Sequence, residues 1–298
     1  KITKDLNPTY GSIQLLYSMD SDMIALCEDK CIRILADKDA LYNADGSMNV
    51  TYNENVLGQA IPYAGDFGIS TNPESFCLYG FRGYFSDKSR GVILRLSRDG
   101  LTVISEKGMT SYFRNKLANA DTVIGSFDET SGQYNVTLAN DTVSFSETIG
   151  GWVSRKSFIP ESGISINNTY YTLYQGVLWS HDNETRNTFY NGPIEKSSVQ
   201  VILNAEASVI KNIKTLSYEG SAGWTTPLIL TDQQDGYIPN YINKEGLYFN
   251  FVKGITTEWN NTTNQGTLDT KEFSTQGIGA VVNITGDVDR TVFKLTIK

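Results

Sequence analysis

Short runs of β-branched and aromatic residues, separated by turns, restrict what this chain can fold into more than any other feature. Strand-like runs occupy residues 75–79, 92–97 and 101–104, with turns rich in Gly, Asp and Ser between them. Residues of these types suit a pleated, half-buried surface. Strand–turn–strand units at this spacing are typical of a β-propeller blade.

The same layout recurs twice further along the chain. Two strand-like runs flank an acidic turn at residues 128–132, and two more flank Gln175-Gly176. Three similar units predict a repeat architecture of irregular period. Repeats that are arranged radially leave only short, protected strand edges.

Composition favours an all-β, mainly antiparallel protein. The 298 residues include 17 Tyr and 26 Gly, and only 19% are charged, as expected for strands with frequent reversals. One helix is predicted at residues 109–118, with Thr110 or Ser111 as its cap. Its apolar face would consist of Met109, Tyr112, Phe113 and Leu117. We therefore predict propeller-like repeats of short strands, a separate C-terminal β layer, and at most one or two short helices.

The pattern of strand-like runs changes after Trp224, and this change predicts a domain boundary. Pro227 and several turn residues interrupt the strand pattern, and a polar turn follows at residues 259–266. Strand-like runs on either side of the boundary are residues 198–203, 210–218, 246–252, 280–284 and 291–297. We expect a propeller-like domain over residues 1–224 and a C-terminal β platform over residues 225–298.

The N-terminal segment carries one clear hairpin. Residues 23–35 predict two strands joined at residues 28–30, with Cys27 and Cys31 facing each other across the turn. With Cys77 the chain has three cysteines. This low, odd count argues against a disulfide framework, so half-buried reduced thiols are expected rather than a strained bridge. No matching His or Cys pair completes a zinc site.

Two further expectations concern the segment after this hairpin. Residues 43–46 are predicted to form a plain turn, because they lack the spaced oxygen ligands of an EF-hand. Residues 57–66 are predicted to form a loop, because Pro62 cannot donate a hydrogen bond within a central strand.

Charge limits the partners of the chain. Its net charge is −8, and an acidic chain is a poor general nucleic-acid binder because phosphate affinity depends on Lys and Arg. The simplest interpretation of the net charge is that it keeps the protein soluble. A more specific hypothesis is that acidic residues line a lumen and so prevent DNA from binding to its wall as it passes. No apolar run approaches the roughly 20 residues of a membrane span, and no signal peptide opens the sequence. Since it starts at Lys1 and stops in a strand-like run, we expect a longer parent polypeptide.

Catalytic chemistry finds little support in the sequence. His181 is the only histidine, and although Asp182 adjoins it, no Gly-x-Ser-x-Gly nucleophile motif occurs. Carboxylates recur in turns at Asp87, Asp128 and Glu129, yet nothing pairs two of them at the separation that glycoside hydrolysis needs. We therefore predict a protein that is not an enzyme, with no catalytic residue, no metal site and no cofactor.

The middle of the chain resembles a known group of proteins. The resemblance is carried, in this order, by residues 125–129, 134–138, 144–147, 151–161, 181–182, 186–190 and 214–220. These segments span roughly a third of the chain. Their order resembles the muzzle or nozzle proteins that close the tails of short-tailed phages, particularly crAss-like phages and related phages of marine bacteria and Bacteroidetes.

The resemblance implies a structural role in a virion. Several copies would form a closed ring, a homo-oligomer, that holds the genome in and releases it during ejection. The partners would be its own copies, other tail and portal-adaptor proteins, and double-stranded DNA passing through the lumen without specific binding, with no membrane involved. The ring would belong to the phage tail and be assembled in the bacterial host cytoplasm.

Two glycine–tryptophan corners, Gly150-Gly151-Trp152 and Gly223-Trp224, suggest where copies could touch. Trp and Tyr concentrate in interface centres, although large side chains at strand ends can equally plug a core. Arg155 and Lys156 lie beside the first corner, where a charge pair with a neighbour would fix orientation more than affinity. The candidate interface or corner residues are Trp152, Arg155, Lys156, Trp179 and Trp224.

Two other functions stay open at this point. A carbohydrate-binding β-propeller adhesin of the tail would need aromatic residues that line an exposed, concave pocket. A glycoside hydrolase would need a catalytic carboxylate pair, for which Asp87, Asp128 and Asp182 are the candidates.

Overall fold

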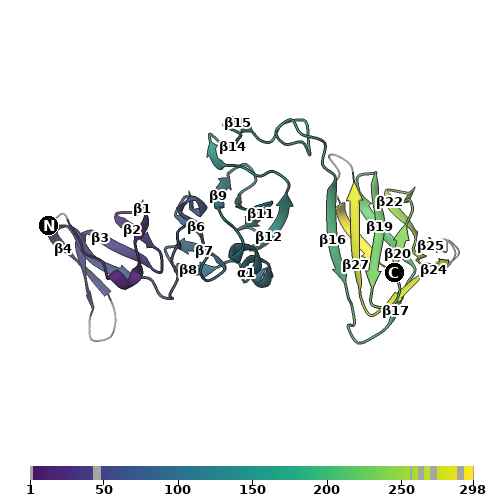
Figure 1. The fold of residues 1–298 in the computed structure, drawn as a ribbon, viewed down its shortest axis with the longest axis horizontal. Helices are drawn as coiled ribbons and strands as arrows, with labels where there is room; N and C mark the ends of the chain where they lie inside the picture. The colour runs from purple at the N-terminus through teal and green to yellow at the C-terminus, as the bar shows by residue number, and fades with distance from the viewer. Residues whose placement is uncertain are drawn as a thin grey trace. The chain divides into compact units, whose positions relative to one another are not determined.

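The chain folds into two compact units, Lys1–Asn183 and Glu184–Lys298. The computed structural model describes residues 3–42, 48–255, 257–260, 265–268, 274–286 and 292–297. Within these ranges the protein consists mainly of small antiparallel sheets with one α-helix, so the all-β prediction is confirmed (Figure 1).

The first unit contains four antiparallel sheets, of which three have four strands and the last has three. The first sheet comprises β1 (Ile13–Met19), β2 (Asp22–Cys27), β3 (Cys31–Tyr42) and β4 (Met48–Pro62). The second comprises β5 (Cys77–Tyr79), β6 (Arg82–Asp87), β7 (Val92–Ser97) and β8 (Gly100–Val103). The third comprises β9 (Val123–Asp128), β10 (Gln133–Leu138), β11 (Asp141–Ser146) and β12 (Gly151–Lys156). The fourth comprises β13 (Ser162–Ile166), β14 (Thr169–Tyr174) and β15 (Val177–Ser180).

Consecutive strands are neighbours in each of these sheets. This up-and-down order is the strand order of a propeller blade. Two short 3₁₀ helices, η1 (Pro8–Tyr10) and η2 (Pro73–Ser75), precede the first and second sheets.

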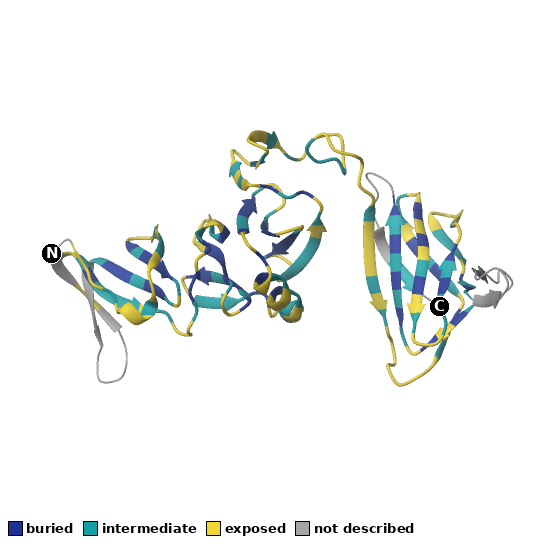
Figure 2. Ribbon diagram, viewed as in Figure 1, coloured by how far each residue is buried: buried dark blue, intermediate teal, exposed yellow. Residues whose placement is uncertain are grey.

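Apolar cores join the first three sheets face to face. Successive side chains of β6 and β7 point to opposite faces of the second sheet. Phe85 and Leu94 pack with the first sheet, whereas Tyr84 and Ile93 pack with the third. All four side chains are fully buried, and the buried bands on these strands are visible in Figure 2. Burial of apolar surface on both faces of the second sheet therefore holds the stack together.

The third and fourth sheets meet through hydrogen bonds instead. The hydroxyl oxygens of Ser126 and Tyr170 are 2.7 Å apart, and Ser165 Oγ donates to the carbonyl oxygen of Phe127 at 2.8 Å. Gly163 lies so close to Ser126 that a Cβ on this glycine would be 2.8 Å from the serine Cβ. Close approach thus brings polar side chains of the two sheets together.

Two acidic turns have the same construction. Asp87 Oδ1 accepts the backbone N–H of Arg90 at 3.0 Å, and Asp128 Oδ1 accepts that of Ser131 at 3.1 Å. The glycine that closes each turn has a positive φ, 68° in the first and 63° in the second, which glycine adopts without strain. The sequence similarity of these two units therefore has a common local cause.

The predicted helix is confirmed as α1, Thr110–Ala118. Its buried face is the predicted one, with Met109, Tyr112, Phe113 and Leu117. The predicted cap is wrong, because the N-cap residue is Met109 and no side chain caps the helix. The core contact of Met109 sets where the helix begins and leaves Thr110 and Ser111 inside its first turn. No helix in the described part of the chain is long and apolar enough to cross a membrane.

The predicted N-terminal hairpin is formed by β2 and β3. Its register pairs Cys31 with Leu26, so Cys31 and Cys27 do not stand opposite each other. Both thiols are free and buried, which raises their pKa values and leaves them mainly protonated at neutral pH. The expected half-buried pair is thus a fully buried one.

The predicted loop at residues 57–66 is wrong over residues 57–62, which belong to β4. This strand lies at the edge of the first sheet, and Pro62 is its last residue. A missing N–H costs little at such a position. The turn predicted at residues 43–46 lies outside the described residues.

The second unit is built mainly from two sheets with a core between them. One sheet contains β16 (Ser197–Leu203), β27 (Ala280–Gly286), β19 (Trp224–Thr231), β20 (Gly236–Ile238) and β23 (Lys253–Gly254), in this order. The other contains β21 (Ile242–Lys244), β22 (Leu247–Phe251), β18 (Thr215–Gly220) and β28 (Val292–Ile297). Two further ladders pair β17 (Lys211–Ile213) with β26 (Thr275–Gly277) and β24 (Thr257–Asn260) with β25 (Gln265–Leu268). Tyr218, Trp224 and Val282 belong to the shared core.

The second unit begins before the boundary predicted at residue 224. β16 pairs with β27, and β18 pairs with β22 and β28, so strands from both sides of Trp224 share sheets. The predicted domains 1–224 and 225–298 are therefore corrected to units that divide after Asn183. Pairing between strands far apart in the sequence leaves no local mark from which this boundary could be predicted.

Three local features of the second unit also differ from expectation. The single strand predicted at residues 210–218 is divided into β17 and β18, which lie in different ladders. Pro227 lies within β19 rather than at a boundary, where the register shifts and no N–H is required. The polar turn predicted at residues 259–266 is shorter, because Trp259 and Gly266 are paired strand residues.

Candidate functional site

Trp152, the first predicted interface residue, is engaged within its own chain. Its Nε1 donates to the carbonyl oxygen of Ile104 at 3.0 Å. Its ring lies 4.4 Å from that of Phe113 and 5.3 Å from that of Phe145, measured between centroids. Trp152 thus bridges the second sheet, the third sheet and α1, as in the core-plug alternative for this corner.

Arg155 and Lys156 point to opposite faces of β12, because they are neighbours in a strand. Arg155 is exposed, and its guanidinium lies over the ring of Tyr112 at 4.6 Å from the centroid. Lys156 Nζ donates to Asn135 Oδ1 at 3.2 Å on the side that faces the fourth sheet. Of the two cations, only Arg155 is placed to meet another molecule.

The other two tryptophans lie in different units. Trp179 is half-buried in β15, opposite Thr172. Trp224 is 4% exposed, opens β19 and packs its ring on Gly286, where a Cβ would lie 2.8 Å from the indole. The structure therefore does not gather the five predicted residues into one site.

A polar cluster lies where the third sheet faces the fourth. Asn135 is fully buried, and its Oδ1 accepts hydrogen bonds from Lys156 and, at 2.6 Å, from Ser144 Oγ. Asp128 Oδ2 is 4.0 Å from Lys156 Nζ. Burial lowers the pKa of Lys156, although Asp128 and Asp182 act in the opposite direction.

His181 adjoins this cluster. Its Nε2 is 2.7 Å from Thr172 Oγ1, and its ring packs against those of Phe158 and Tyr170. Burial lowers the pKa of His181, and the nearby Lys156 ammonium lowers it further. The histidine is therefore mainly neutral at pH 7.

Asp87, one of the predicted carboxylates, is fully buried within its own turn. Its oxygens accept hydrogen bonds from the N–H of Gly68, the hydroxyl of Ser70 and the guanidinium of Arg90. A carboxylate held in this way organises the turn and is shielded from substrates. Within the described ranges, no group of three or more His, Cys, Asp or Glu side chains could hold a metal ion.

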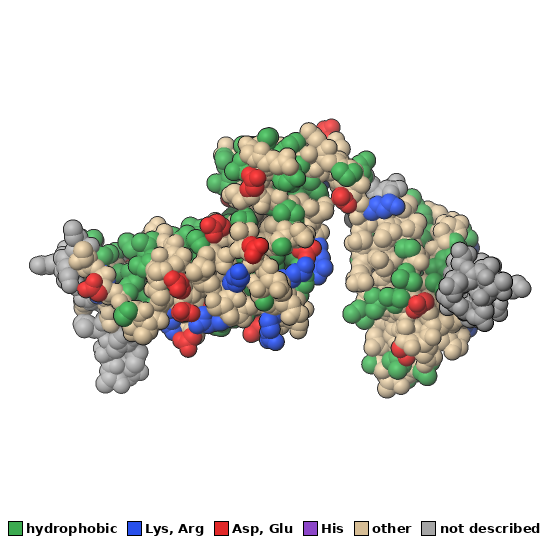
Figure 3. Space-filling view, in the orientation of Figure 1, with side chains coloured by type: hydrophobic (Ala, Val, Ile, Leu, Met, Phe, Trp, Pro, Cys, Tyr) green, Lys and Arg blue, Asp and Glu red, His purple; other side chains and the backbone are tan. Residues whose placement is uncertain are grey.

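The fourth sheet exposes an apolar face that the sequence prediction missed. β-strand alternation and the register place one set of side chains together on this face, namely Ile164, Ile166, Tyr171, Leu173 and Leu178. Ile164 is 57% exposed and Leu178 59%. The opposite face, which includes Tyr170 and Thr172, is buried towards the third sheet. Hydrophobic side chains gather at this end of the first unit in Figure 3.

A sequence signal for this face exists. Both faces of β14 and β15 carry apolar or aromatic residues, a pattern typical of a sheet that is covered on two sides. We name the set Ile164, Ile166, Tyr171, Leu173 and Leu178 the bare face.

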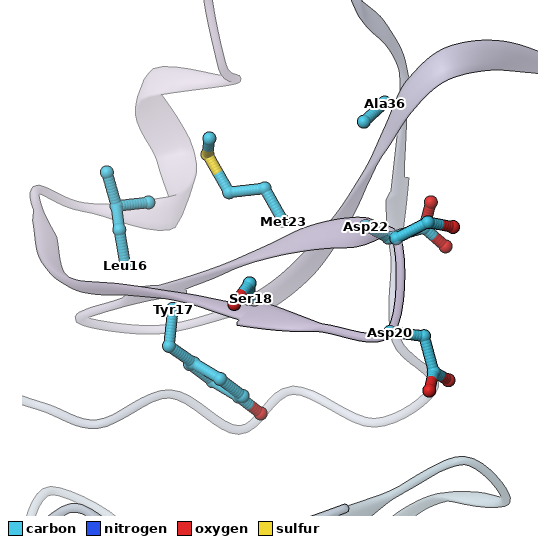
Figure 4. Close-up of a pocket in the computed structure, with 8 residues that line it drawn as sticks. Leu16, Tyr17, Ser18, Asp20, Asp22, Met23 and Ala36 are labelled. Atoms are coloured by element: carbon cyan, nitrogen blue, oxygen red, sulfur yellow. The ribbon is translucent and has the colours of Figure 1, made fainter.

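A shallow hollow of about 400 Å³ lies on the first sheet (Figure 4). Leu16, Met23 and Ala36 supply its apolar wall, and Asp20 and Asp22 stand at one side. Asp20 forms a two-point ion pair with Arg98, at 2.7 and 3.0 Å, and Asp22 accepts from Arg33 Nε at 2.7 Å. The hollow is therefore apolar with neutralised charges at its rim.

No protein-family model matches the chain, and no curated protein matches it. Among solved structures, the chain has a weak similarity to PorZ, an essential bacterial surface component of the type-IX secretion system of Porphyromonas gingivalis. The two are 9% identical with a TM-score of 0.16, and the match covers 95% of this chain and 59% of PorZ. This chain thus spans less than two thirds of that protein, and a likeness at this TM-score bears on neither fold nor function.

Proposed function

We propose that this chain is a structural component of a phage tail, a subunit of the muzzle or nozzle ring that closes the DNA channel and releases the genome during ejection. The sequence segments between residues 125 and 220 support the phage assignment through their resemblance to tail muzzle proteins. The bare face of the fourth sheet supports an assembly role, and it is the observation that carries the proposal.

A second copy of the chain is the occupant that would continue the stack. The first three sheets pack apolar face against apolar face, the fourth meets the third through hydrogen bonds, and the bare face of the fourth sheet is exposed. The hollow lies on the first sheet, and all of the residues that line it belong to that sheet or its turns. Contact between these two different surfaces is heterologous, and heterologous contacts form rings when the rotation closes. The ion pairs at Asp20 and Asp22 mean that this contact would bury no lone carboxylate there.

In this proposal the ring acts mechanically. Its partners are its own copies, other tail and portal-adaptor proteins, and DNA in transit. A net charge of −8 disfavours adhesion of the passing DNA. The ring belongs to the virion and is assembled in the host cytoplasm.

Light scattering and negative-stain microscopy of the purified chain test the assembly. We expect ring-shaped oligomers, and we expect the double variant Ile164→Lys/Leu178→Lys to remain monomeric, since it places two charges on the bare face. Ile149→Lys is the control, because Ile149 is 74% exposed in the turn before β12 and outside the bare face. A monomeric wild type, or rings that survive in the double variant, would contradict the assembly.

The phage assignment needs its own test. In phage particles that encode this chain, mass spectrometry should find it in the purified virion, and labelled antibodies should mark the tip of the tail. Detection only in the host-cell fraction would overturn the assignment.

The hollow on the first sheet supports a second candidate, a carbohydrate-binding adhesin of the tail. The hydroxyl-bearing residues Ser18 and Ser21 line it beside its apolar wall, and a few polar groups next to an apolar surface suit a sugar ring. A glycan array probed with the chain should then show binding that Met23→Trp abolishes by filling the hollow. Absence of binding across the array would remove this candidate.

A further inference from the structure

A lysine, an asparagine and an aspartate meet where the fourth sheet covers the third. Asn135 of β10 and Lys156 of β12 share one face of the sheet, with β11 between their strands. Lys156 Nζ lies 3.2 Å from Asn135 Oδ1 and 4.0 Å from Asp128 Oδ2. The side chains of Lys156 and Asp128 are only 20% and 4% exposed.

The surroundings fix the orientation of the Asn135 amide. A lysine ammonium has donors only, so it faces the amide oxygen, which also accepts from Ser144 Oγ. The amide nitrogen, Nδ2, is buried and has no hydrogen-bond partner among the described residues. Two donors thus polarise the carbonyl, whereas no hydrogen bond from the described part of the chain holds the amide nitrogen. A nucleophile that attacks the carbonyl carbon of this amide can therefore displace the amide nitrogen as the leaving group.

Lys156 has the properties of the required nucleophile. Burial lowers its pKa, which increases the share of the neutral amine, the form that attacks carbonyl carbon. Asp128 can take the ammonium proton, since its Oδ2 faces Lys156 while its Oδ1 is held by the N–H of Ser131. The amine, the acceptor carbonyl and a proton carrier therefore stand together away from water.

We propose that Lys156 and Asn135 join through an intramolecular isopeptide bond. The Nζ–Cγ bond forms and the Cγ–Nδ2 bond breaks, so one amide replaces another. Two protons leave Lys156 Nζ through Asp128 and pass to the departing nitrogen, which is released as ammonium. The lysine ammonium charge is thereby transferred to the product, and no oxidant, reductant or further reactant takes part.

The bond would fasten β10 to β12 across β11. A covalent link in this position persists when the hydrogen bonds of the third sheet open, and it restricts the unfolded chain as other cross-links do. It lies within one chain, so it is independent of ring formation.

Intact-mass spectrometry of the full 298-residue chain tests the proposal directly. After incubation at neutral pH, the wild type should weigh less than its sequence by one ammonia, and tandem spectra of the digest should contain a branched peptide that joins Asn135 to Lys156. Lys156→Met and Asn135→Ala should each restore the full mass. Lys116→Met is the matched control, because Lys116 pairs with Asp141 on the more exposed surface, and it should keep the mass deficit. A wild type that keeps its full mass overturns the bond, whether or not the variants fold.

The role of Asp128 is tested by rate. Asp128→Asn should slow the loss of ammonia at least tenfold, because it removes the proton carrier and leaves both reacting groups in place. An unchanged rate in a folded Asp128→Asn protein would exclude Asp128 from the reaction.

Discussion

At the scale of single residues, the absence of one side chain decides how β9 meets η2. A Cβ on Gly125 would collide with the carbonyl oxygen of Ser75, which also accepts a hydrogen bond from Tyr134 Oη at 3.1 Å. We expect Gly125→Ala to lower the free energy of unfolding by about 1–3 kcal/mol or more, as overpacking does. Gly151→Ala is the control, since a Cβ there has open space. Equal urea midpoints for the two variants would contradict this reading.

The single histidine gives the first unit a pH dependence with a defined sign. The pKa of His181 is lowered from its ordinary 6.5 in the folded state, by burial and then by Lys156, so the unfolded chain takes up the proton first as pH falls. The associated stability is therefore complete above pH 6.5 and is lost below it, through the interval down to the lowered pKa. Urea unfolding at about pH 7.5 and about pH 5.5 should show a smaller loss for His181→Gln than for the wild type. Equal losses in the two proteins would count against His181 as the source.

At the scale of elements, α1 owes its position to packing rather than to its ends. It has no side-chain cap, and its buried residues Phe113 and Leu117 join the core of the second and third sheets. We expect Phe113→Ala to cost about 3–5 kcal/mol of unfolding free energy. Asn115→Ala, on the exposed side of the same helix, should change it by less than about 0.5 kcal/mol. Thermal unfolding of both variants measures the difference. A loss of unfolding free energy in Phe113→Ala as small as that in Asn115→Ala would mean that the sheets hold together without the helix.

At the scale of the whole molecule, the segment between β15 and β16 separates two independent cores. It contains no strand, and its Arg186 and Lys196 are exposed. Brief trypsin treatment should therefore yield a stable N-terminal fragment that ends at Arg186 or Lys196. Replacing both residues with Gln should delay this fragment, as gel electrophoresis with mass spectrometry would show. Cleavage within Lys1–Asn183 before cleavage at Arg186 or Lys196 would contradict the division into two stable units.

Sequence reasoning succeeded where a feature depends on neighbouring residues. The hairpins, the acidic turns and α1 follow from side chains within a few positions of one another, and the structure confirms each of them. It failed for the cap of α1, for Pro62 and for the domain boundary, because a core contact, an edge position and long-range pairing decided these. Among the candidate interface residues, Trp152 and Lys156 make contacts within their own chain, and a role of these residues between copies stays a prediction.

The sequence by itself determined the strand class, the repeated strand–turn units and the position of α1, because alternation of side chains and turn chemistry act locally. Only the tertiary structure decided which strands share a sheet and which faces remain bare. It also decided that Lys156, Asn135 and Asp128 meet, although they come from three different strands. Such meetings depend on register and on the stacking of sheets, which no short stretch of sequence encodes.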